Sequence, residues 1–181
     1  MTPGPGSGVA ALRFVAVGQH DELARPLLAE LAHEYGTRYE KSVAEMHREL
    51  VDHPVTEFAP PHGALVIALR DDVPVAGGAF RRVDGQTAEL KRIWTAAHSR
   101  RRGLGHQVLV ELERRILELG YLRIRLTTGW RQPEAVALYL AAGYTPLFDP
   151  AAYPIARTAH AFVKDLVAAP RQSDVPAPRT P

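Results

Sequence analysis

Six consecutive residues carry the clearest chemical signal in this sequence. Residues 100–105 read Arg-Arg-Arg-Gly-Leu-Gly, and a segment with helical periodicity follows directly. The first turn of a helix has N–H groups without partners and a partial positive charge, and glycines let the backbone approach phosphate oxygens. Neighbouring arginines add charge-assisted hydrogen bonds. The segment predicts a site for a phosphate-bearing anion; a solvated Arg-rich turn, with glycines for tight packing, is the alternative.

The distribution of charge favours a compact anion over a long polyanion. The net charge is only +2, and Arg92, Arg100, Arg101 and Arg102 cluster around this one loop. Extended nucleic-acid binding usually needs a broader basic face, so we expect no nucleic-acid partner. The Gly-x-x-x-x-Gly-Lys-Ser/Thr motif of nucleotide triphosphatases is absent. The dinucleotide-binding pattern is also absent, because position 108 holds Val108 where a third glycine is required.

Composition excludes several other chemistries. The chain has no cysteine, which excludes disulfides, thiolate metal ligands and cysteine nucleophiles. The eight histidines show no metal-binding spacing, and no serine lies in a Gly-x-Ser-x-Gly motif, so we expect no metal and no hydrolase. No apolar run approaches the roughly 18 residues of a membrane helix, and the first residues do not resemble a secretory signal. We therefore expect a cytoplasmic protein without a membrane partner.

The periodicity of the sequence predicts one domain built on a mixed sheet. Residues 1–8 and 169–181 have the composition of disordered tails, the second rich in proline, and residues 9–168 form the domain. Strand patterns cover residues 12–17, 64–69, 73–83, 87–95, 121–128, 144–147 and 158–166. Helical patterns cover a segment that begins at Asp21 and residues 43–52, 104–119 and 133–142. This order predicts an α/β fold: a mixed, mostly antiparallel sheet of about seven strands with about four helices.

Three segments in this order and spacing resemble the GNAT superfamily (GCN5-related N-acetyltransferases). The loop at residues 100–105 contains the family's Arg/Gln-x-x-Gly-x-Gly/Ala signature in full. The strand before it reads Glu-Leu-Lys-Arg-Ile-Trp-Thr at residues 89–95, a frequent family pattern. Residues 132–144 match Asn-x-x-Ala-x-x-Leu-Tyr-x-x-x-Gly-Phe/Tyr, except that Gln132 stands where asparagine is usual. The resemblance covers residues 63–148 well and implies a GNAT-like sheet that splays between its fourth and fifth strands.

The resemblance also implies how acetyl-CoA is held. Its pyrophosphate would lie on the basic loop, and its pantetheine arm would pair with the preceding strand like an added strand. The implied cofactor-binding residues are Ile93, Trp94, Thr95, Arg100, Arg101, Arg102, Gly103, Leu104, Gly105, Gln132 and Tyr139.

Two residues are the candidates for proton transfer. Attack on a thioester needs a neutral amine, whereas an alkyl ammonium has a pKa of about 10, so a base must accept a proton directly or through water. The resemblance makes Tyr139 the acid for the departing thiolate and Glu89 the leading base. The alternatives are a core tyrosine and a solvated carboxylate paired with a neighbouring cation. Weaker candidates for the base are Glu34, Tyr35, Glu57 and Glu134.

The expected function is therefore N-acetyl transfer from acetyl-CoA to a primary amine by direct attack in a ternary complex. The acceptor would be a small molecule, an amino acid or a peptide, selected by the early helices within residues 21–52 and the loop at 60–61. A homodimer is expected from the same resemblance. The first alternative is a regulatory module that binds acyl-CoA without efficient catalysis. An RNA-linked role is the second alternative, and the modest net charge argues against it.

Overall fold

The computed structural model describes residues 11–166 as seven strands and four α-helices joined by short 3-10 turns. The tails predicted at residues 1–8 and 169–181 lie outside the described residues. The strands are β1 (Arg13–Val17), β2 (Ala64–Arg70), β3 (Val73–Arg82), β4 (Thr87–Thr95), β5 (Arg123–Thr128), β6 (Thr145–Pro146) and β7 (His160–Asp165). The helices are α1 (Arg25–Tyr39), α2 (Val43–Val51), α3 (Leu104–Glu118) and α4 (Pro133–Ala141). The 3-10 turns are η1 (Glu22–Ala24), η2 (Val55–Phe58), η3 (Ala97–Ser99) and η4 (Pro150–Ala152).

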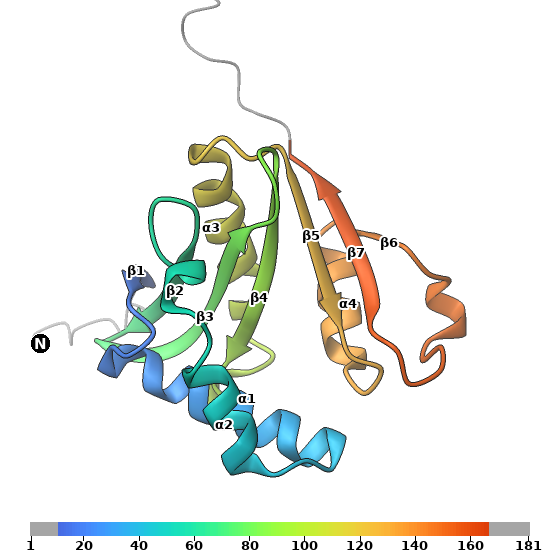
Figure 1. Cartoon of the computed structure of the whole chain (residues 1–181), viewed down its shortest axis with the longest axis horizontal. Coiled ribbons are helices and arrows are strands. Elements are labelled where there is room, and N and C mark those ends of the chain that lie inside the picture. The colour runs from blue at the N-terminus through green and yellow to red at the C-terminus, as the bar shows by residue number, and fades with distance from the viewer. Residues whose placement is uncertain (1–10, 167–181) are drawn as a thin grey trace, which may run out of the picture.

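All seven strands form one sheet in the order β1-β2-β3-β4-β5-β7-β6. Every neighbouring pair is antiparallel except β4 and β5, which run parallel. The pairing of β4 with β5 stops after three residue pairs, the last of which is Glu89 with Arg125. Figure 1 shows the two strands meeting at one end and diverging toward the other. The predicted mixed, mostly antiparallel α/β sheet is confirmed, with the predicted numbers of strands and helices.

A bulge in β4 changes which face of the sheet its side chains reach. The register between β3 and β4 shifts between Gly77 and Ala79, and Arg92 has a φ of 58°. Side chains of a regular strand alternate, so residues 90 and 94 would share a face. Instead, Leu90 belongs to the core under α3, and Trp94 belongs to the core under α1. The bulge therefore turns the last part of β4 over as it enters the divergent region.

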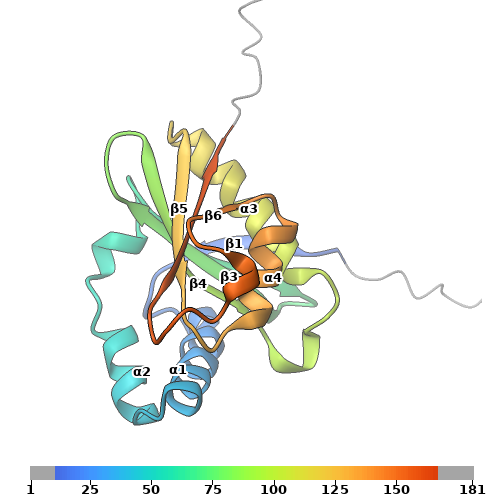
Figure 2. The same cartoon turned by 90° about the vertical axis from the view of Figure 1, so that its right-hand side faces the viewer.

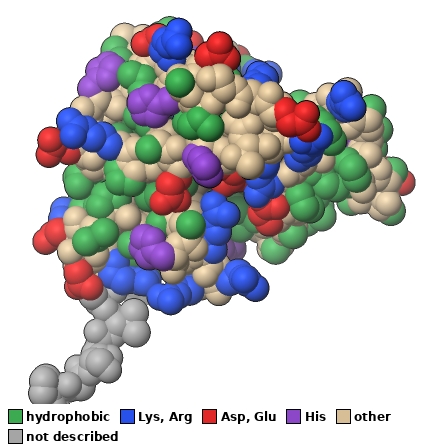
Figure 3. All heavy atoms as spheres, turned by 90° about the horizontal axis from the view of Figure 1, so that it is seen from below, with side chains coloured by type: hydrophobic (Ala, Val, Ile, Leu, Met, Phe, Trp, Pro, Cys, Tyr) green, Lys and Arg blue, Asp and Glu red, His purple; other side chains and the backbone are tan. Residues whose placement is uncertain are grey.

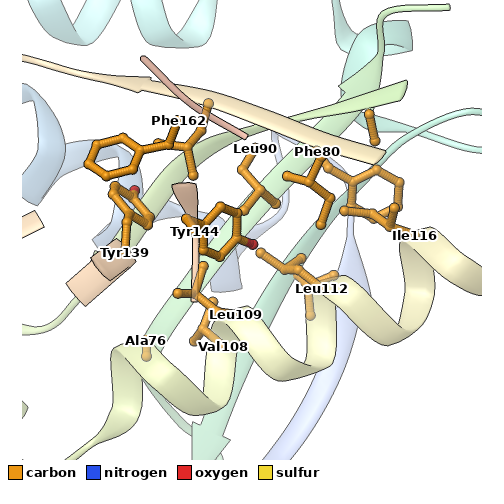
Figure 4. Packing of buried hydrophobic residues seen from close by; sticks show 14 of the residues in the cluster. Ala76, Phe80, Leu90, Val108, Leu109, Leu112, Ile116, Tyr139, Tyr144 and Phe162 are labelled. Carbon is orange, nitrogen blue, oxygen red and sulfur yellow. The ribbon is translucent and has the colours of Figure 1, made fainter. Parts of the chain in front are cut away.

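Helices cover both faces of the sheet. The buried stripe of α3 packs on one face, together with α4, around Phe80, Leu112 and Phe162 (Figure 4). α1 packs on the other face through buried leucines and contacts β3 and β4, and α2 lies beside α1 (Figure 2). This arrangement places α3 and α4 on one side of the divergent region and α1 and α2 on the other. None of the helices described in residues 11–166 is long and apolar enough to span a membrane.

The predicted element boundaries differ from the structure mainly where caps intervene. The helix expected from Asp21 begins as η1, and α1 proper starts at Arg25, with a proline in its first turn. The strand expected from Tyr121 starts at Arg123 because Tyr121 still belongs to the cap of α3. The Tyr121 N–H donates to Ile116 O (3.2 Å) while Gly120 adopts a φ of 88°.

Candidate active site

The divergence of β4 and β5 opens a cavity of about 820 Å³. Its walls come from α1, α2, η2, β3, β4, β5, α4 and the loop that leads into α3. The cavity therefore reaches both faces of the sheet at the point where the sheet is interrupted. Of the predicted cofactor-binding residues, those that line it are Ile93, Trp94, Thr95, Arg100, Arg101, Gly103, Leu104, Gly105, Gln132 and Tyr139.

The basic loop has the backbone geometry expected of an anion site. Gly103 caps the N-terminus of α3 with φ 74° and ψ 5°, a left-handed conformation that favours glycine. Nothing lies within 4 Å of a Cβ built at Gly103, so conformation and not space requires the glycine. A Cβ at Gly105 would stand 3.2 Å from Leu138 Cδ2, on the wall of the cavity. Both glycines thus leave the first amides of α3 open to the cavity.

The three arginines of the loop behave differently. Arg100 donates to Glu34 Oε2 (2.8 Å) and to the Thr95 carbonyl (3.3 Å), which joins the loop to α1 and to the end of β4. Arg101 lines the cavity and has a φ of 59°. Arg102 is exposed and does not line the cavity, so its predicted role in cofactor binding depends on reach from outside.

The edge of β4 that faces β5 has no strand partner over residues 90–95. Ile93, Trp94 and Thr95 line the cavity along this edge. Trp94 directs its indole away, because its Nε1–H donates to Glu30 Oε2 (3.0 Å) on α1. The backbone of this segment is what an extended ligand would meet, as an added strand meets a sheet edge.

Tyr139 stands deep in the cavity wall. It lies on α4, its ring packs 5.5 Å from Phe162 and 5.7 Å from Tyr144, and only 7% of the residue is exposed (Figure 4). Burial raises the pKa of Tyr139 above its usual value, with a smaller contribution from Tyr35. No hydrogen bond links its hydroxyl to another of the residues at 11–166. The group is therefore a protonated donor that lacks a protein acceptor.

Gln132 is held at the start of α4 by its own side chain. Its Oε1 accepts from the Thr128 hydroxyl (2.8 Å) and the Gly129 N–H (2.9 Å), and its backbone N–H donates to the Tyr153 hydroxyl (2.8 Å). The replacement of asparagine by glutamine thus leaves a lining residue that connects β5 to α4.

Glu89 lies where β4 and β5 part, in a cluster of cations. Its carboxylate pairs with Arg81 (2.8 Å), Lys91 (3.5 Å) and Arg125 (3.7 Å), and 5% of the residue is exposed. Arg81 and Lys91 line the cavity, whereas Glu89 itself does not. Glu89 therefore lies behind the cavity wall, with Arg81 and Lys91 between it and the cavity.

The weaker candidates for the base separate by position and by pKa. Glu34, Tyr35 and Glu134 line the cavity, and Glu57 does not. Burial raises the pKa of Tyr35 to about 12. The hydrogen bond from Arg81, followed by that from His53, lowers the pKa of Glu57. Burial would raise the pKa of Glu134, but its bond with Arg38 outweighs this effect and the pKa is lowered.

The structure adds cavity residues that sequence reasoning did not assign. Met46, Leu50 and His53 come from α2 and the turn after it, Phe58 comes from η2, and Arg92 comes from the bulge of β4. The helical pattern of residues 43–52 is a sequence signal for an apolar face, but it does not indicate what that face covers. The expectation that the early helices border the site is supported by this lining.

The cavity wall is of mixed charge. Arg38 bonds Glu134, Arg100 bonds Glu34, and basic and acidic side chains lie side by side over the face in Figure 3. Within the described part of the chain, no three His, Asp or Glu side chains cluster so as to hold a metal ion.

Comparison with known proteins defines the family. Residues 25–144 match the family model described as Acetyltransferase (GNAT) family. The match covers well over half of the chain, so the chain belongs to this family. A search of curated protein sequences finds no match.

Solved structures share the fold at low identity. A GNAT-family acetyltransferase from Staphylococcus aureus Mu50 superposes with a TM-score of 0.68 at 14% identity, over 87% of this chain and 100% of the other. The PaiA N-acetyltransferase from Thermoplasma acidophilum, in complex with coenzyme A, gives 0.66 at 14%, over 86% and 99%. A GNAT-family acetyltransferase from Elizabethkingia anophelis, with acetyl-CoA bound, gives 0.62 at 18%, over 86% and 98%. These likenesses establish the GNAT fold for this chain.

Proposed function

We propose that this protein transfers the acetyl group of acetyl-CoA to a primary amine of a small molecule, an amino acid or a peptide. The observation that carries the proposal is the composition of the cavity of about 820 Å³: residues of the basic loop, the free edge of β4 and Tyr139 line it. The loop at residues 100–105 can hold phosphates, and the edge of β4 can pair with an extended chain. The Tyr139 hydroxyl on α4 can donate a proton into the cavity. Two solved relatives of the same fold contain coenzyme A or acetyl-CoA, which supports this assignment.

In this proposal acetyl-CoA lies along the opened edge of β4. The amides at the start of α3 and the arginines of the loop hold its pyrophosphate, because Gly103 and Gly105 leave room for the phosphate oxygens. The pantetheine arm follows residues 93–95. The acceptor then enters from the side of α1 and α2.

The chemistry follows from the positions of the proton donors and acceptors. The amine loses a proton through water to Glu89, which stays our predicted base, and its lone pair attacks the thioester carbonyl. Negative charge on the carbonyl oxygen is stabilised by a backbone N–H of β4. The carbon–sulfur bond then breaks, and Tyr139 donates its hydroxyl proton to the departing sulfur. The nitrogen gives up its remaining excess proton through water to the Tyr139 oxygen, which restores the hydroxyl. The products are an N-acetyl amine and free coenzyme A.

A regulatory module that binds acyl-CoA without efficient transfer is the alternative function. The unpaired hydroxyl of Tyr139 favours the enzyme, since a pure binding module has no need of a buried proton donor that faces the ligand. Cytoplasmic location and a homodimer stay predictions.

The proposal is tested by incubating the protein with acetyl-CoA and a panel of primary amines. Free thiol is measured over time, and the mass gain of one acetyl group is sought on each amine. We expect thiol release that depends on an amine and matches the acetylated product in amount. Tight acetyl-CoA binding with no acetylated amine from a broad panel would favour the regulatory module instead.

A further inference from the structure

One cationic side chain in the cavity lacks the partner that its burial requires. Arg92 is 8% exposed, lines the cavity, and stacks over the Phe58 ring with Cζ 4.4 Å from the ring centroid. Its side-chain hydrogen bonds within residues 11–166 go to neutral acceptors: Gln19 Oε1 (2.9 Å) and the Leu50 carbonyl (2.7 Å). A guanidinium has five N–H donors, so hydrogen-bonding capacity remains.

No carboxylate of residues 11–166 lies within the 4.0 Å of an ion pair with Arg92. The nearby acids have other partners: Glu57 pairs with Arg81 and His53, and Glu89 pairs with Arg81 and Lys91. A buried charge with no carboxylate in contact is costly: burial lowers the pKa of Arg92 to about 10, and the smaller opposing effects of Tyr35 and Glu57 do not offset it. Other cationic side chains around the cavity, such as Arg38, Arg81 and Arg100, do pair with carboxylates.

The surroundings hold the guanidinium in place and do not neutralise it. Gln19 is 5% exposed, and its Nε2 donates to the Val51 and His53 carbonyls, which fixes its Oε1 toward Arg92. The backbone of Arg92 adopts a φ of 58° at the bulge, a conformation that non-glycine residues rarely take. Rigid neutral contacts of this kind orient a charged group for a ligand.

We propose that Arg92 binds an anionic group of the acceptor, so that the amine substrate also carries a carboxylate. This inference rests on the proposed N-acetyltransferase function and names its class of acceptor. The apolar neighbours Met46, Leu50 and Phe58 leave the guanidinium as a polar anchor in that end of the cavity.

Such an acceptor would reach from Arg92 to the reacting centre within one cavity. Arg92, Tyr35 and Tyr139 all line this cavity. A small amino acid anchored at Arg92 can therefore direct its amine toward the acetyl group beside Tyr139. Glu49 lines the same region and is exposed, and it can attract the ammonium before the proton is lost.

The competing explanation is that Arg92 has only a structural role, in which its hydrogen bond to the Leu50 carbonyl holds the end of α2 against the sheet. Assays with paired acceptor substrates distinguish the two roles. The pairs are common L-amino acids and β-alanine, each compared with its own primary amide, and phosphoethanolamine compared with ethanolamine. Each pair differs in the anionic group. The variants are Arg92→Gln, which keeps an amide for Gln19 and Leu50, and Arg92→Lys, which keeps the charge.

The wild type should prefer the carboxylate member of at least one pair by about tenfold or more in kcat/KM, mainly through KM. Arg92→Gln should abolish that preference while the rate with the amide changes little, and Arg92→Lys should restore part of it. Preference for phosphoethanolamine in place of every carboxylate would overturn the carboxylate assignment. Equal losses for both members of each pair, or no preference in the wild type, would leave Arg92 with only the structural role and overturn the inference.

A binding measurement separates this inference from the proposed function. Acetyl-CoA is titrated into each variant by calorimetry, and N-acetyl amino acids and their amides are titrated into the protein saturated with coenzyme A. If acetyl-CoA binds but no amine is acetylated, the proposed function fails. Tighter binding of the N-acetyl carboxylates, lost in Arg92→Gln, would even then support anion recognition, and equal binding of acid and amide would refute it.

Discussion

Two buried tyrosines, Tyr139 and Tyr144, have rings 5.7 Å apart but different surroundings. Tyr144 donates its hydroxyl proton to Glu113 Oε1 (2.8 Å), and Tyr139 faces the cavity without an acceptor from the described chain. The pair offers a matched test of the proton donor, because the same atom is removed from two adjacent rings.

Tyr139→Phe should lower kcat by about 10²–10⁴-fold, the usual contribution of a positioned acid, and leave the dissociation constant of acetyl-CoA unchanged. Tyr144→Phe should leave kcat near that of the wild type and lower the free energy of unfolding by about 1–2 kcal/mol, because the Glu113 bond is lost. Steady-state kinetics, calorimetry and denaturant unfolding measure these effects. Equal kcat values for the two variants would remove Tyr139 from the mechanism.

The pH dependence of kcat follows from the raised pKa of Tyr139. An acid must be protonated to act. Burial raises the pKa of the Tyr139 hydroxyl above its usual value of 10.0, so the hydroxyl stays protonated at pH 10. We therefore expect no loss of kcat from an acidic group as the pH rises to about 10. A decline of kcat centred between neutral pH and 9, seen in the wild type with saturating substrates, would contradict this role.

Glu89 and Glu57 both bind Arg81, which provides a control for the predicted base. Glu89→Gln should lower kcat roughly 100-fold, because the proton acceptor is lost. Glu57→Gln also removes one ion pair from Arg81 and should change kcat far less. Similar kinetics for both variants would show that Glu89 acts by holding Arg81, and not as a base.

At the level of residues, sequence patterns located the groups that belong to contiguous motifs. Gly103 and Gly105 were predicted as part of an anion loop, and that role stays a prediction: Gly103 is a left-handed cap, and a Cβ at Gly105 would stand 3.2 Å from Leu138 Cδ2. Arg92 was predicted only as a member of a basic cluster. Its neutral hydrogen-bond partners, Gln19 and Leu50, are distant in sequence, so no local pattern indicates them. No local pattern reveals that a buried cation lacks a partner.

At the level of elements, α3 has a glycine with positive φ at each end. Gly103 has a φ of 74°, Gly120 has a φ of 88°, and a Cβ at either would meet nothing within 4 Å. Gly103→Ala and Gly120→Ala should therefore destabilise the fold to a similar extent, about 1–2 kcal/mol each. Only Gly103→Ala places a methyl group at the anion site, so only this variant should weaken acetyl-CoA binding, by roughly tenfold or more.

Denaturant unfolding and calorimetry on the two glycine variants separate stability from binding. If both variants bind acetyl-CoA as the wild type does, the first turn of α3 does not hold the phosphates. If both lose binding, the effect comes from general loss of helix stability.

The strands and helices were predictable because their periodicity is strong and their turn residues are typical. Asp71 and Asp72 both adopt positive φ in the turn between β2 and β3, as a two-residue hairpin turn requires. The bulge at Arg92 was not predictable in position, since no glycine marks it and only tertiary contacts stabilise its φ of 58°. The short 3-10 turns were missed because three or four residues carry too little periodicity.

At the level of the whole molecule, the sheet behaves as two parts joined at three residue pairs of β4 and β5. The cavity of about 820 Å³ exists because residues 90–95 of β4 do not pair with β5. Helices from both faces of the sheet form its side walls. The family motifs predict the sheet and the loop at residues 100–105, whereas Met46, Leu50 and Arg92 enter the cavity wall from α2 and the bulge of β4. The sequence could therefore predict the loop better than this other part of the wall.

The most direct test of the central claim is calorimetric titration of the wild-type protein with acetyl-CoA, with S-acetylpantetheine as the control. S-acetylpantetheine has the same thioester and lacks the pyrophosphate that the loop is proposed to hold. We predict a micromolar dissociation constant for acetyl-CoA, which is a binding free energy of about −8 kcal/mol, and far weaker binding of S-acetylpantetheine. Absence of acetyl-CoA binding, or equal affinity for both ligands, would contradict the central claim.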